Sequence, residues 1–422
     1  MRQRLERAFR QVLPQLDPAP GVRRTLDLRR DALATVRDVV LVAIGKAARP
    51  MAQAALQELQ GLRCSGLCIT PAPDGAPLPP LEVLAAGHPL PDAASLRAGE
   101  RALEVCWGAG NRDAVLFLLS GGGSALCDLP LDDTVTLAEW QRLHRALIGC
   151  GAGIEQVNTV RMHLSATKGG RLALAAASAE IQLTLAVSDV PGDLSALASG
   201  PTMPTTATLD DCRAVVDAFG LRGAIPASLL RQLDDATLPP LVRPNDPCVR
   251  ASEFVRLLDN DRAIAAMAEA LQADGLRVVV DRSANELPCD EAARVLLRRL
   301  ADEAGRGTPV AVVAGGEVRV ALPAEPGTGG RNQQFALQSA LAIAGRDIAV
   351  LSCGTDGQDG SAPAAGAFAD GTTVARATAL GLDAAEHLRR CDAHPVFEAL
   401  GDAIVTGPTG TNVRDVRVLV HA

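Results

Sequence analysis

The chain has 422 residues, 48% of them hydrophobic and 21% charged, with a formal net charge of −8. This length and composition predict two or three globular domains with sizeable cores. Aromatic residues make up only 2% of the chain and tyrosine is absent, which disfavours a protein that stacks nucleobases on aromatic side chains. The acidic balance, without a basic tract, disfavours nucleic acid and anionic membranes as partners.

The sequence indicates neither a targeting signal nor a disulfide framework. No stretch reaches the roughly 18 uninterrupted apolar residues of a membrane-spanning helix, and the start of the chain lacks the apolar segment of a secretion signal. The ten cysteines are scattered, and the pair Cys64 and Cys68 has no second pair at zinc-binding spacing. We therefore expect free thiols in a reducing compartment and a cytoplasmic protein.

Hydrophobic periodicity predicts alternating helices and strands in the first half of the chain. Thr136 and Glu139 have the spacing of a capping box at the start of one helix. The expected elements are a helix at 5–16, a strand at 38–44, a helix at 47–59, strands at 67–70 and 81–85, a helix at 91–103, a strand at 114–119, a helix at 136–148, a helix at 160–177 interrupted by two glycines, and a strand at 181–187.

The same alternation resumes after a proline-rich stretch at about 235–250, which we interpret as a domain boundary. Strands that alternate with helices predict parallel sheets joined by right-handed crossovers. The elements expected in the second half are strands at 277–280, 309–314, 318–322, 348–352, 403–406 and 416–420, and helices at 290–303 and 332–344.

A glycine-rich loop, Ser120-Gly121-Gly122-Gly123-Ser124, follows the expected strand at 114–119. Glycine tolerates positive φ and carries no Cβ, so such a loop can turn its backbone N–H groups toward an anion, and the two serines add hydroxyl donors. The carboxyl edge of a parallel sheet is also where ligands usually bind. The loop therefore predicts a phosphate or carboxylate cradle, although a tight turn with closely packed glycines is the simpler alternative.

Two further strand ends in the first half carry charged residues. Lys46 follows the strand at 38–44 and opens a helix, a position suited to an anionic ligand but also to an ordinary surface lysine. Asp189 and Asp193 follow the strand at 181–187 in a Pro-Gly turn. Two carboxylates at this spacing suit a Mg²⁺ ion or a hydroxyl proton, whereas turn and capping roles explain one of them more easily than both.

The second half repeats this pattern of glycine with charge at strand ends and helix starts. Glu317 follows Gly315-Gly316, and Asp356 follows the strand at 348–352. Arg331 lies in the run 327–333, where a glycine-rich loop opens a helix, an arrangement suited to phosphate unless it is only a surface loop. No G-x-G-x-x-G fingerprint follows any expected strand, which weighs against a nicotinamide-dependent dehydrogenase.

Taken in order, these segments resemble the class II glycerate 2-kinases, whose C-terminal half is the MOFRL domain. The resemblance runs from about residue 40 to 415, and no single segment carries it alone. Departures from the family pattern occur at 192–195, which is one residue shorter, at Gln334, and at 361–363. The matching segments are 43–48, 87–92, 119–125, 158–165, 168–173, 188–193, 315–317, 329–333, 354–357 and 409–413.

The resemblance implies an α/β protein of two domains, each an α/β/α sandwich with a mostly parallel sheet and the active site in the cleft between them. Residues 1–240 would form the Rossmann-like N-terminal glycerate kinase domain and residues 250–422 the MOFRL-containing domain. The implied activity is ATP-dependent phosphorylation of D-glycerate on its 2-hydroxyl, with Mg²⁺ as cofactor. A homodimer is compatible with the family.

The family reading also gives roles to the strand-end residues. Lys46, Asp189 and Arg331 are the expected catalytic residues, with Lys46 and Arg331 on phosphate or carboxylate and Asp189 on the reacting hydroxyl or Mg²⁺. Two other functions remain open: an NAD(P)H-dependent hydroxypyruvate reductase and a non-catalytic sugar-acid-binding protein. Expected substrate- and nucleotide-binding residues are Ser120, Gly121, Gly122, Gly123, Ser124, Gly329, Gly330 and Asn332, and expected metal ligands are Asp193, Glu317 and Asp356.

Overall fold

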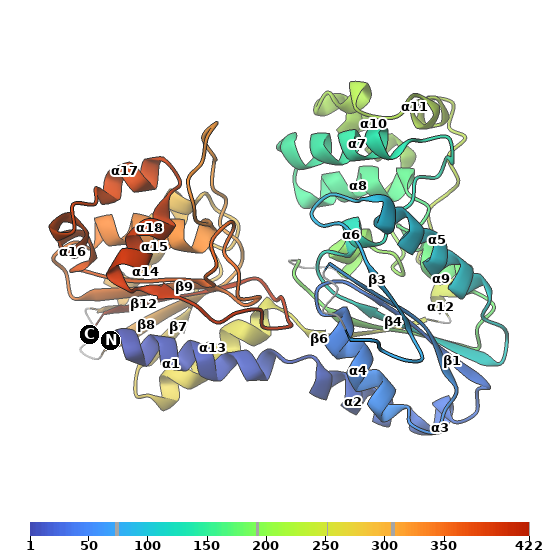
Figure 1. Ribbon diagram of the computed structural model, residues 1–422, viewed down its shortest axis with the longest axis horizontal. Coiled ribbons are helices and arrows are strands. Elements are labelled where there is room, and N and C mark those ends of the chain that lie inside the picture. The colour runs from blue at the N-terminus through green and yellow to red at the C-terminus, as the bar shows by residue number, and fades with distance from the viewer. Residues whose placement is uncertain (72–75, 191–193, 251, 305–308, 422) are drawn as a thin grey trace. The chain divides into compact units, whose positions relative to one another are not determined.

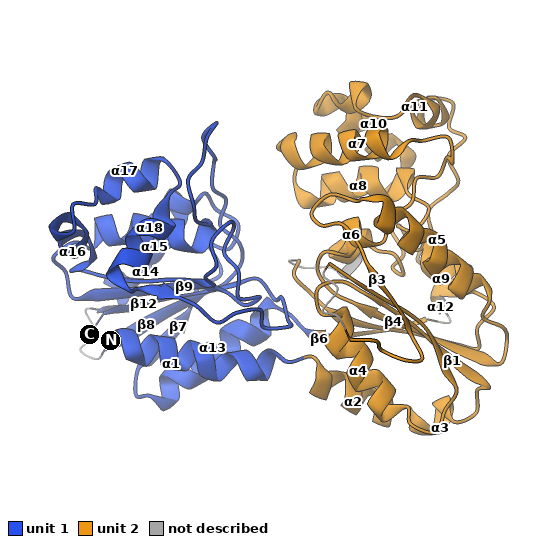
Figure 2. Cartoon of the chain, in the orientation of Figure 1, with its two compact units in different colours: residues 1–17, 258–422 blue, residues 18–257 orange. Residues whose placement is uncertain are grey.

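A computed structural model of the chain describes residues 1–71, 76–190, 194–250, 252–304 and 309–421 (Figure 1). The chain divides into two compact units (Figure 2). Unit 1 contains residues 1–17 and 258–422, and unit 2 contains residues 18–257. The first 17 residues therefore belong with the C-terminal part of the chain, and the division falls beyond the proline-rich stretch where the sequence suggested it.

Unit 2 is built on a six-stranded sheet in the order β3-β2-β1-β4-β5-β6. Every strand pair of this sheet whose register is described is parallel. All seven residues of β4 are buried, which explains its continuous apolar sequence, because parallel strands are covered on both faces. The strands are β1 (Asp38–Ile44), β2 (Cys64–Thr70), β3 (Glu82–Ala85), β4 (Asp113–Leu119), β5 (Ile181–Val187) and β6 (Ser252–Leu258).

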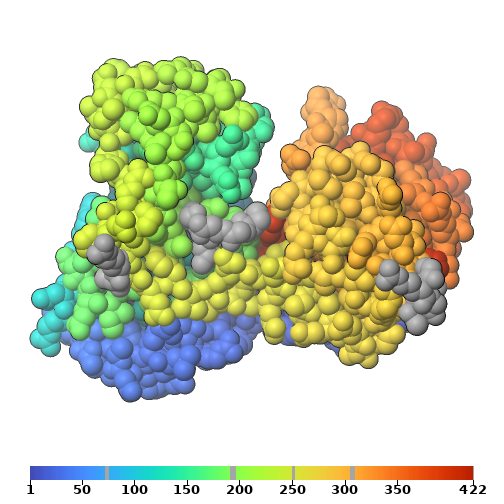
Figure 3. Space-filling model, turned by 180° about the vertical axis from the view of Figure 1, so that it is seen from behind, coloured from blue at the N-terminus to red at the C-terminus, as the bar shows by residue number. Residues whose placement is uncertain are grey.

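Helices cover this sheet and add an outer helical layer to unit 2 (Figure 1). Alternate residues of β1 share one core with α5, while α4 packs against α2 and the strands. The outer layer has its own apolar core around Trp140. Its helices α10 and α11 lie in the green to yellow-green surface of unit 2 in Figure 3. The helices are α2 (Ala19–Asp27), α3 (Arg30–Leu33), α4 (Ala48–Glu58), α5 (Ala93–Trp107), α6 (Gly123–Leu126), α7 (Leu137–Gly149), α8 (Ile154–Leu164), α9 (Arg171–Ala175), α10 (Leu209–Ala218), α11 (Ala227–Asp234) and α12 (Pro247–Arg250).

Unit 1 contains a second six-stranded sheet, in the order β11-β10-β9-β12-β8-β7. Only β7 and β8 are parallel, and the other described pairs are antiparallel. The prediction of a mostly parallel sheet in this half is therefore wrong. The last strand inserts between β8 and β9, and β10 returns beside β9 without a helix between them. The strands are β7 (Arg277–Val280), β8 (Val310–Ala314), β9 (Ile348–Gly354), β10 (Gly366–Asp370), β11 (Ala403–Ile404) and β12 (Asp415–His421).

The helices of unit 1 lie on both faces of its sheet (Figure 1). On one face, α1 buries Leu5, Phe9 and Val12 and packs on α13; on the other face, α14 and α15 pack on the strands. The strand expected at 318–322 does not form; Arg319 makes only an isolated bridge with Pro288. The helices are α1 (Arg2–Val12), α13 (Asn260–Ala273), α14 (Cys289–Ala304), α15 (Arg331–Ala342), α16 (Thr373–Ala379), α17 (Ala384–Arg389) and α18 (Ala393–Leu400).

Among the described residues, no helix combines the length and apolarity needed to cross a membrane.

Candidate active site

The strand ends of β1 and β4 form the centre of the candidate site in unit 2. Ile44 and Leu119 are register partners, so the loops that follow them start at the same level. The chain leaves β1 toward β2 on one side and β4 toward β5 on the other. Such a topological switch point opens a crevice at the carboxyl edge of the sheet, where ligands bind in α/β proteins.

Backbone hydrogen bonds join these two loops. The N–H of Ser120 donates to the carbonyl of Ile44 over 2.9 Å, and the N–H of Lys46 donates to the carbonyl of Gly121 over 2.9 Å. The N–H of Ala47 donates to Ser120 Oγ over 2.9 Å. The backbone of Lys46 and the glycine-rich loop are therefore held together.

Asp189 and His88 complete the surroundings of the glycine-rich loop. A Cβ on Gly121 would overlap the Asp189 carboxylate, and a Cβ on Gly122 would lie 3.4 Å from His88 Nε2. Gly122 also has a φ of 89°, in the left-handed region that glycine favours. Glycine is therefore needed at 121 to leave space for the Asp189 carboxylate and at 122 for the left-handed backbone.

A pocket of about 290 Å³ opens beside this loop. Gly122, Ser124 and Asp189, which the sequence predicted, line it together with His88 and Arg161, which it did not assign to the site. The remaining lining residues are Pro89, Ala125, Ile148, Ile154, Val190, Ala196 and Ala198.

A network of buried polar groups lies behind the loop. Lys168 Nζ donates to the carbonyl of Cys127 over 2.6 Å and to that of Gly123 over 3.4 Å, and lies 3.6 Å from Asp128 Oδ1. Ser165 Oγ donates to Asp128 Oδ1 over 2.6 Å. The side chains of Lys168 and Asp128 are each 1% exposed. Because Lys168 holds the carbonyls at both ends of α6, it fixes the short helix that follows the loop.

Two side chains of α7 also contact the Asp128 carboxylate. Trp140 Nε1 donates to Asp128 Oδ2 over 3.1 Å, and His144 Nε2 lies 2.9 Å from the same oxygen. Burial alone would raise the pKa of Asp128, but Lys168 and His144 outweigh it and hold that pKa well below its usual range. Burial lowers the pKa of His144, with Asp128 opposing, so His144 is neutral near pH 7.

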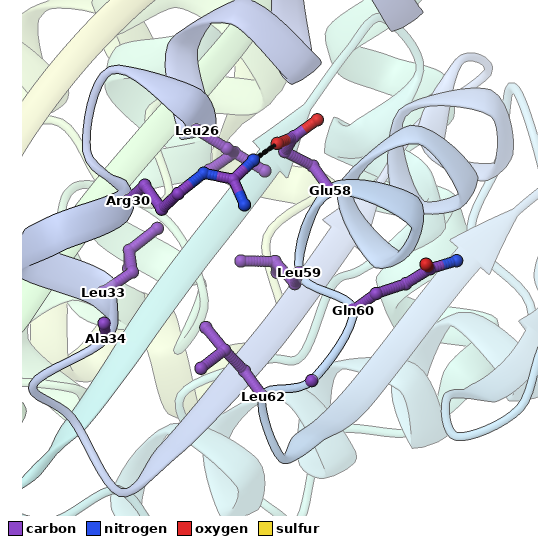
Figure 4. A pocket seen from close by; sticks show the side chains of 9 residues that line it. Leu26, Arg30, Leu33, Ala34, Glu58, Leu59, Gln60 and Leu62 are labelled. Atoms are coloured by element: carbon purple, nitrogen blue, oxygen red, sulfur yellow. Dashed lines mark hydrogen bonds and ion pairs between the residues drawn. The ribbon is translucent and has the colours of Figure 1, made fainter.

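A different pocket lies at the opposite edge of the same sheet, where α4 ends and β2 begins (Figure 4). It has a volume of about 260 Å³, and its wall is formed by Leu26, Leu33 and Leu59 with the ion pair of Arg30 and Glu58. It lies at the amino ends of the strands, so none of the strand-end residues predicted for the site lines it.

In unit 1, Arg331 stands at the start of α15 and is held by two carboxylates. Its Nε donates to Asp415 Oδ2 over 2.7 Å, and its Nη2 donates to Glu317 Oε1 over 2.7 Å and to Asp415 Oδ1 over 3.0 Å. Burial works against the charged guanidinium, but Asp415 outweighs it and raises the pKa of Arg331. Arg331 is therefore charged and fixed in orientation.

The glycine-rich run before α15 packs around a carboxylate of the chain itself. Asp359 Oδ1 accepts from the N–H of Asn332 over 2.9 Å, and Oδ2 accepts from the N–H of Gln333 over 2.8 Å. A Cβ on Gly330 would overlap Asp359. A phosphate bound at these helix N–H groups would have to displace Asp359, so the predicted anion-binding role of Gly329, Gly330 and Asn332 has no support from this contact.

Two of the three metal ligands predicted from the sequence, Glu317 and Asp356, are described, and each interacts with other groups of unit 1. Glu317 is paired with Arg331, and Asp356 Oδ1 accepts from the N–H of Gln358 over 3.1 Å. Asp193 lies outside the described residues. Within the described part of the chain, no group of three or more His, Cys, Asp or Glu side chains could hold a metal ion.

The rarity of lysine is a sequence signal that points to the glycine-rich loop and α6. Lys46 and Lys168 are the chain's only lysines, and every other basic side chain except histidine is arginine. Both lysines contact the segment that contains the glycine-rich loop and α6. A compact ammonium fits between carbonyl groups where a planar guanidinium would not, so the rarity of lysine could have identified Lys168.

The fold and the site define an α/β protein of two units, with a glycine-rich loop at the switch point of the parallel sheet of unit 2. Two family profiles match the chain: the one described as "Domain of unknown function (DUF4147)" over residues 4–234 and the MOFRL family over residues 310–415. The chain belongs to the DUF4147/MOFRL glycerate kinase family.

Relatives of known name cover nearly the whole chain. The chain is 36% identical to the D-glycerate 2-kinase of Thermotoga maritima over 386 residues, which covers 90% of this chain and 89% of the relative. It is also 36% identical to an Agrobacterium vitis protein named "Putative hydroxypyruvate reductase" over 99% of this chain and 94% of the relative. The crystal structure of glycerate kinase from Thermotoga maritima matches with a TM-score of 0.85 and 32% identity, covering 100% and 99% of the two chains.

Proposed function

We propose that this protein is a D-glycerate 2-kinase, which transfers the terminal phosphoryl group of ATP to the 2-hydroxyl of D-glycerate. The observation that carries the proposal is the 36% identity to the D-glycerate 2-kinase of Thermotoga maritima over 90% of the chain. The switch-point loops of unit 2 fit this chemistry. A kinase needs hydrogen-bond donors that bind phosphate oxygens, and beside them a group that can accept a hydrogen bond from the substrate hydroxyl.

In this proposal, phosphoryl transfer depends on positioning and charge neutralisation rather than on covalent chemistry by the protein. Lys46 and the N–H groups of the loop 120–124 hold anionic oxygens. Asp189 orients the acceptor hydroxyl and takes its proton as the new O–P bond forms. The contact of Asp189 with Gly121 supports this role, because it holds the carboxylate against the anion-binding loop.

Arg331 is the proposed charge partner from unit 1. Its Nε and Nη2 are used by Asp415 and Glu317, whereas its Nη1 makes no hydrogen bond to any described residue. The remaining nitrogen can meet a phosphate oxygen while the two carboxylates keep the guanidinium in place. We propose that the complete site uses groups of both units, since Lys46 and Arg331 belong to different ones.

ATP is the proposed donor and Mg²⁺ its proposed partner. Protein-bound Mg²⁺ keeps several waters and takes one or two carboxylates besides the phosphates, so a cage of three protein ligands is not required. Asp356, which the sequence predicted as a metal ligand, is the described carboxylate that we propose for this role. When bound, the ion would neutralise charge on the phosphates.

Reduction of hydroxypyruvate is the alternative that the name of the Agrobacterium vitis relative raises. Two assays on the purified protein separate the functions. We expect ADP to form when D-glycerate, ATP and Mg²⁺ are supplied, and no oxidation of NADH or NADPH with hydroxypyruvate. Oxidation of either nucleotide with no ADP formation would overturn the proposal.

A further inference from the structure

Arg161, near the end of α8, is a partly buried cation with no hydrogen-bond or ion-pair partner among the described residues. Its Nε is buried and lacks a hydrogen-bond partner, and no hydrogen bond or ion pair of its guanidinium is found among the described residues. Burial lowers the pKa of Arg161, with Asp128 opposing. Holding an unpaired guanidinium in such surroundings is costly unless something compensates its charge.

The nearby network does not supply this compensation. Asp128 is its one described carboxylate, and it already interacts with the ammonium of Lys168. His144 adds no negative charge. One carboxylate thus faces two permanent cations, Lys168 and Arg161, which leaves an excess positive charge on the side where Arg161 lines the pocket.

The pocket supplies the rest of an anion site for a small molecule. Its volume of about 290 Å³ suits a small organic acid, and Gly122 and Ser124 of the glycine-rich loop line it with Arg161. The exposed side chains of Ile148 and Ile154 add apolar wall. Asp189 lines the same pocket. A molecule with adjacent carboxylate and hydroxyl groups therefore meets Arg161 with its carboxylate and Asp189 with its hydroxyl.

We propose that Arg161 binds the carboxylate of the hydroxy-acid substrate and thereby restricts the enzyme to acids. This inference rests on the proposed function for the identity of the substrate. A guanidinium matches a carboxylate with two parallel N–H donors, and with the carboxylate fixed there the neighbouring 2-hydroxyl can turn toward Asp189.

The test compares Arg161→Gln with Arg161→Lys, and uses Arg145→Gln on the exposed side of α7 as the matched control. Losing a charge-assisted interaction costs roughly 1.5–3 kcal/mol, or about 10- to 150-fold in affinity. We expect Arg161→Gln to raise KM for D-glycerate by that factor and to change KM for ATP by less than about twofold. The KM of Arg161→Lys for D-glycerate should lie between those of Arg161→Gln and the wild type. The control should match the wild type.

A binding measurement that needs no turnover accompanies the kinetics. 3-Hydroxypropionate keeps the carboxylate of glycerate but lacks the 2-hydroxyl, and glycerol keeps the hydroxyls but lacks the carboxylate. In calorimetric titrations we expect the wild type and Arg145→Gln to bind 3-hydroxypropionate and Arg161→Gln to lose that binding. Glycerol should bind no more than weakly to any of the three proteins.

Equal binding of 3-hydroxypropionate by Arg161→Gln and the wild type would overturn the inference, as would a rise in KM for ATP instead of D-glycerate. If Arg161→Gln fails to fold by circular dichroism, the lysine variant decides, and a wild-type KM and affinity there overturn the inference. A wild type that binds the acid through Arg161 but forms no ADP would refute the kinase proposal and leave this inference standing.

Discussion

Gly121 is the position at which the glycine-rich loop and Asp189 approach each other most closely. A methyl group there would overlap Asp189 Oδ2, so it could be accommodated only if the Asp189 carboxylate moved. The glycines of this loop are therefore explained by two needs, a left-handed backbone at Gly122 and space for a carboxylate at Gly121.

We expect Gly121→Ala to lower kcat/KM for D-glycerate by at least about tenfold, because a shift of the order of an ångström at a reacting group is costly. Gly149→Ala is the matched control, since a Cβ there meets nothing within 4 Å. Steady-state kinetics on both variants check the expectation. Equal activity of the two would mean that the Asp189 contact is irrelevant to turnover.

Lys46 and Arg331 should differ in what their removal costs. Lys46→Ala and Arg331→Ala should each lower kcat/KM by at least roughly 10²-fold, the scale of losing one donor to a developing charge. Only Arg331→Ala should also lower Tm, because it removes a partner of the fully buried Asp415 and leaves Arg417 to compensate. Turnover and thermal unfolding measured together distinguish the two, and near-wild-type turnover in either variant would remove that residue from the mechanism.

Among the elements, α6 shows how the buried network supports the site. This helix spans only Gly123–Leu126, too short to be stable alone. Lys168 fixes it by binding the carbonyls of Gly123 and Cys127, and Asp128 supplies the charge that allows an ammonium to be buried there. The loop geometry at one end of α6 thus depends on an ion pair at the other.

We expect Lys168→Met to destabilise the fold by about 3–5 kcal/mol, because it leaves the Asp128 carboxylate buried without its main partner. Denaturant titrations of this variant, with the exposed Arg145→Gln as control, provide the measurement. A loss below about 1 kcal/mol would show that the pair is not a stabilising feature.

The same ion pair has a defined pH dependence. The pKa of Asp128 is lower in the folded state than its unfolded value of about 3.9, so its contribution is present above that pH and is lost as the pH falls toward the folded pKa. The unfolding free energy of the wild type should therefore fall more steeply below about pH 4 than that of Asp128→Asn. Identical slopes for the two proteins would contradict the assigned pKa direction.

The elements that sequence patterns predicted best are those of unit 2. The strands expected at 38–44, 114–119 and 181–187 match β1, β4 and β5 to within a residue, because parallel strands buried on both faces leave a continuous apolar run between polar turns. That Lys46 contacts the glycine-rich loop was not predicted, because it depends on β1 and β4 being neighbours in the sheet.

Unit 1 was predicted less well, for topological reasons. The strand β10 (Gly366–Asp370) is short and rich in small residues, so it was missed. The position of β12 between β8 and β9 depends on long-range pairing that no local pattern encodes. Arg161 and Lys168 were also missed as site residues, since their importance comes from burial and from partners distant in sequence.

At the scale of the whole molecule, the chain passes from unit 1 into unit 2 and back again. The N-terminal helix α1 buries its apolar face on α13, although all 240 residues of unit 2 lie between them in the sequence. A fragment cut at the proline-rich stretch would therefore expose that face of α1 and lack the edge strand β6.

We expect a fragment of residues 18–257 to unfold cooperatively and a fragment of residues 1–240 to be less stable and more prone to aggregate. Neither should form ADP with D-glycerate, because Arg331 is missing from both. Denaturant titrations and the ADP assay check this. Turnover by either fragment near the rate of the full chain would contradict a site that uses both units.

The position of phosphorylation tests the central claim most directly. Phosphorus nuclear magnetic resonance on the product of D-glycerate, ATP and Mg²⁺ distinguishes the isomers by the number of protons on the esterified carbon. A phosphate on the 2-hydroxyl couples to a single proton and gives a doublet, which is the predicted result. A triplet, from a phosphate on the 3-hydroxyl, or the absence of any new phosphate ester would contradict the assignment as a D-glycerate 2-kinase.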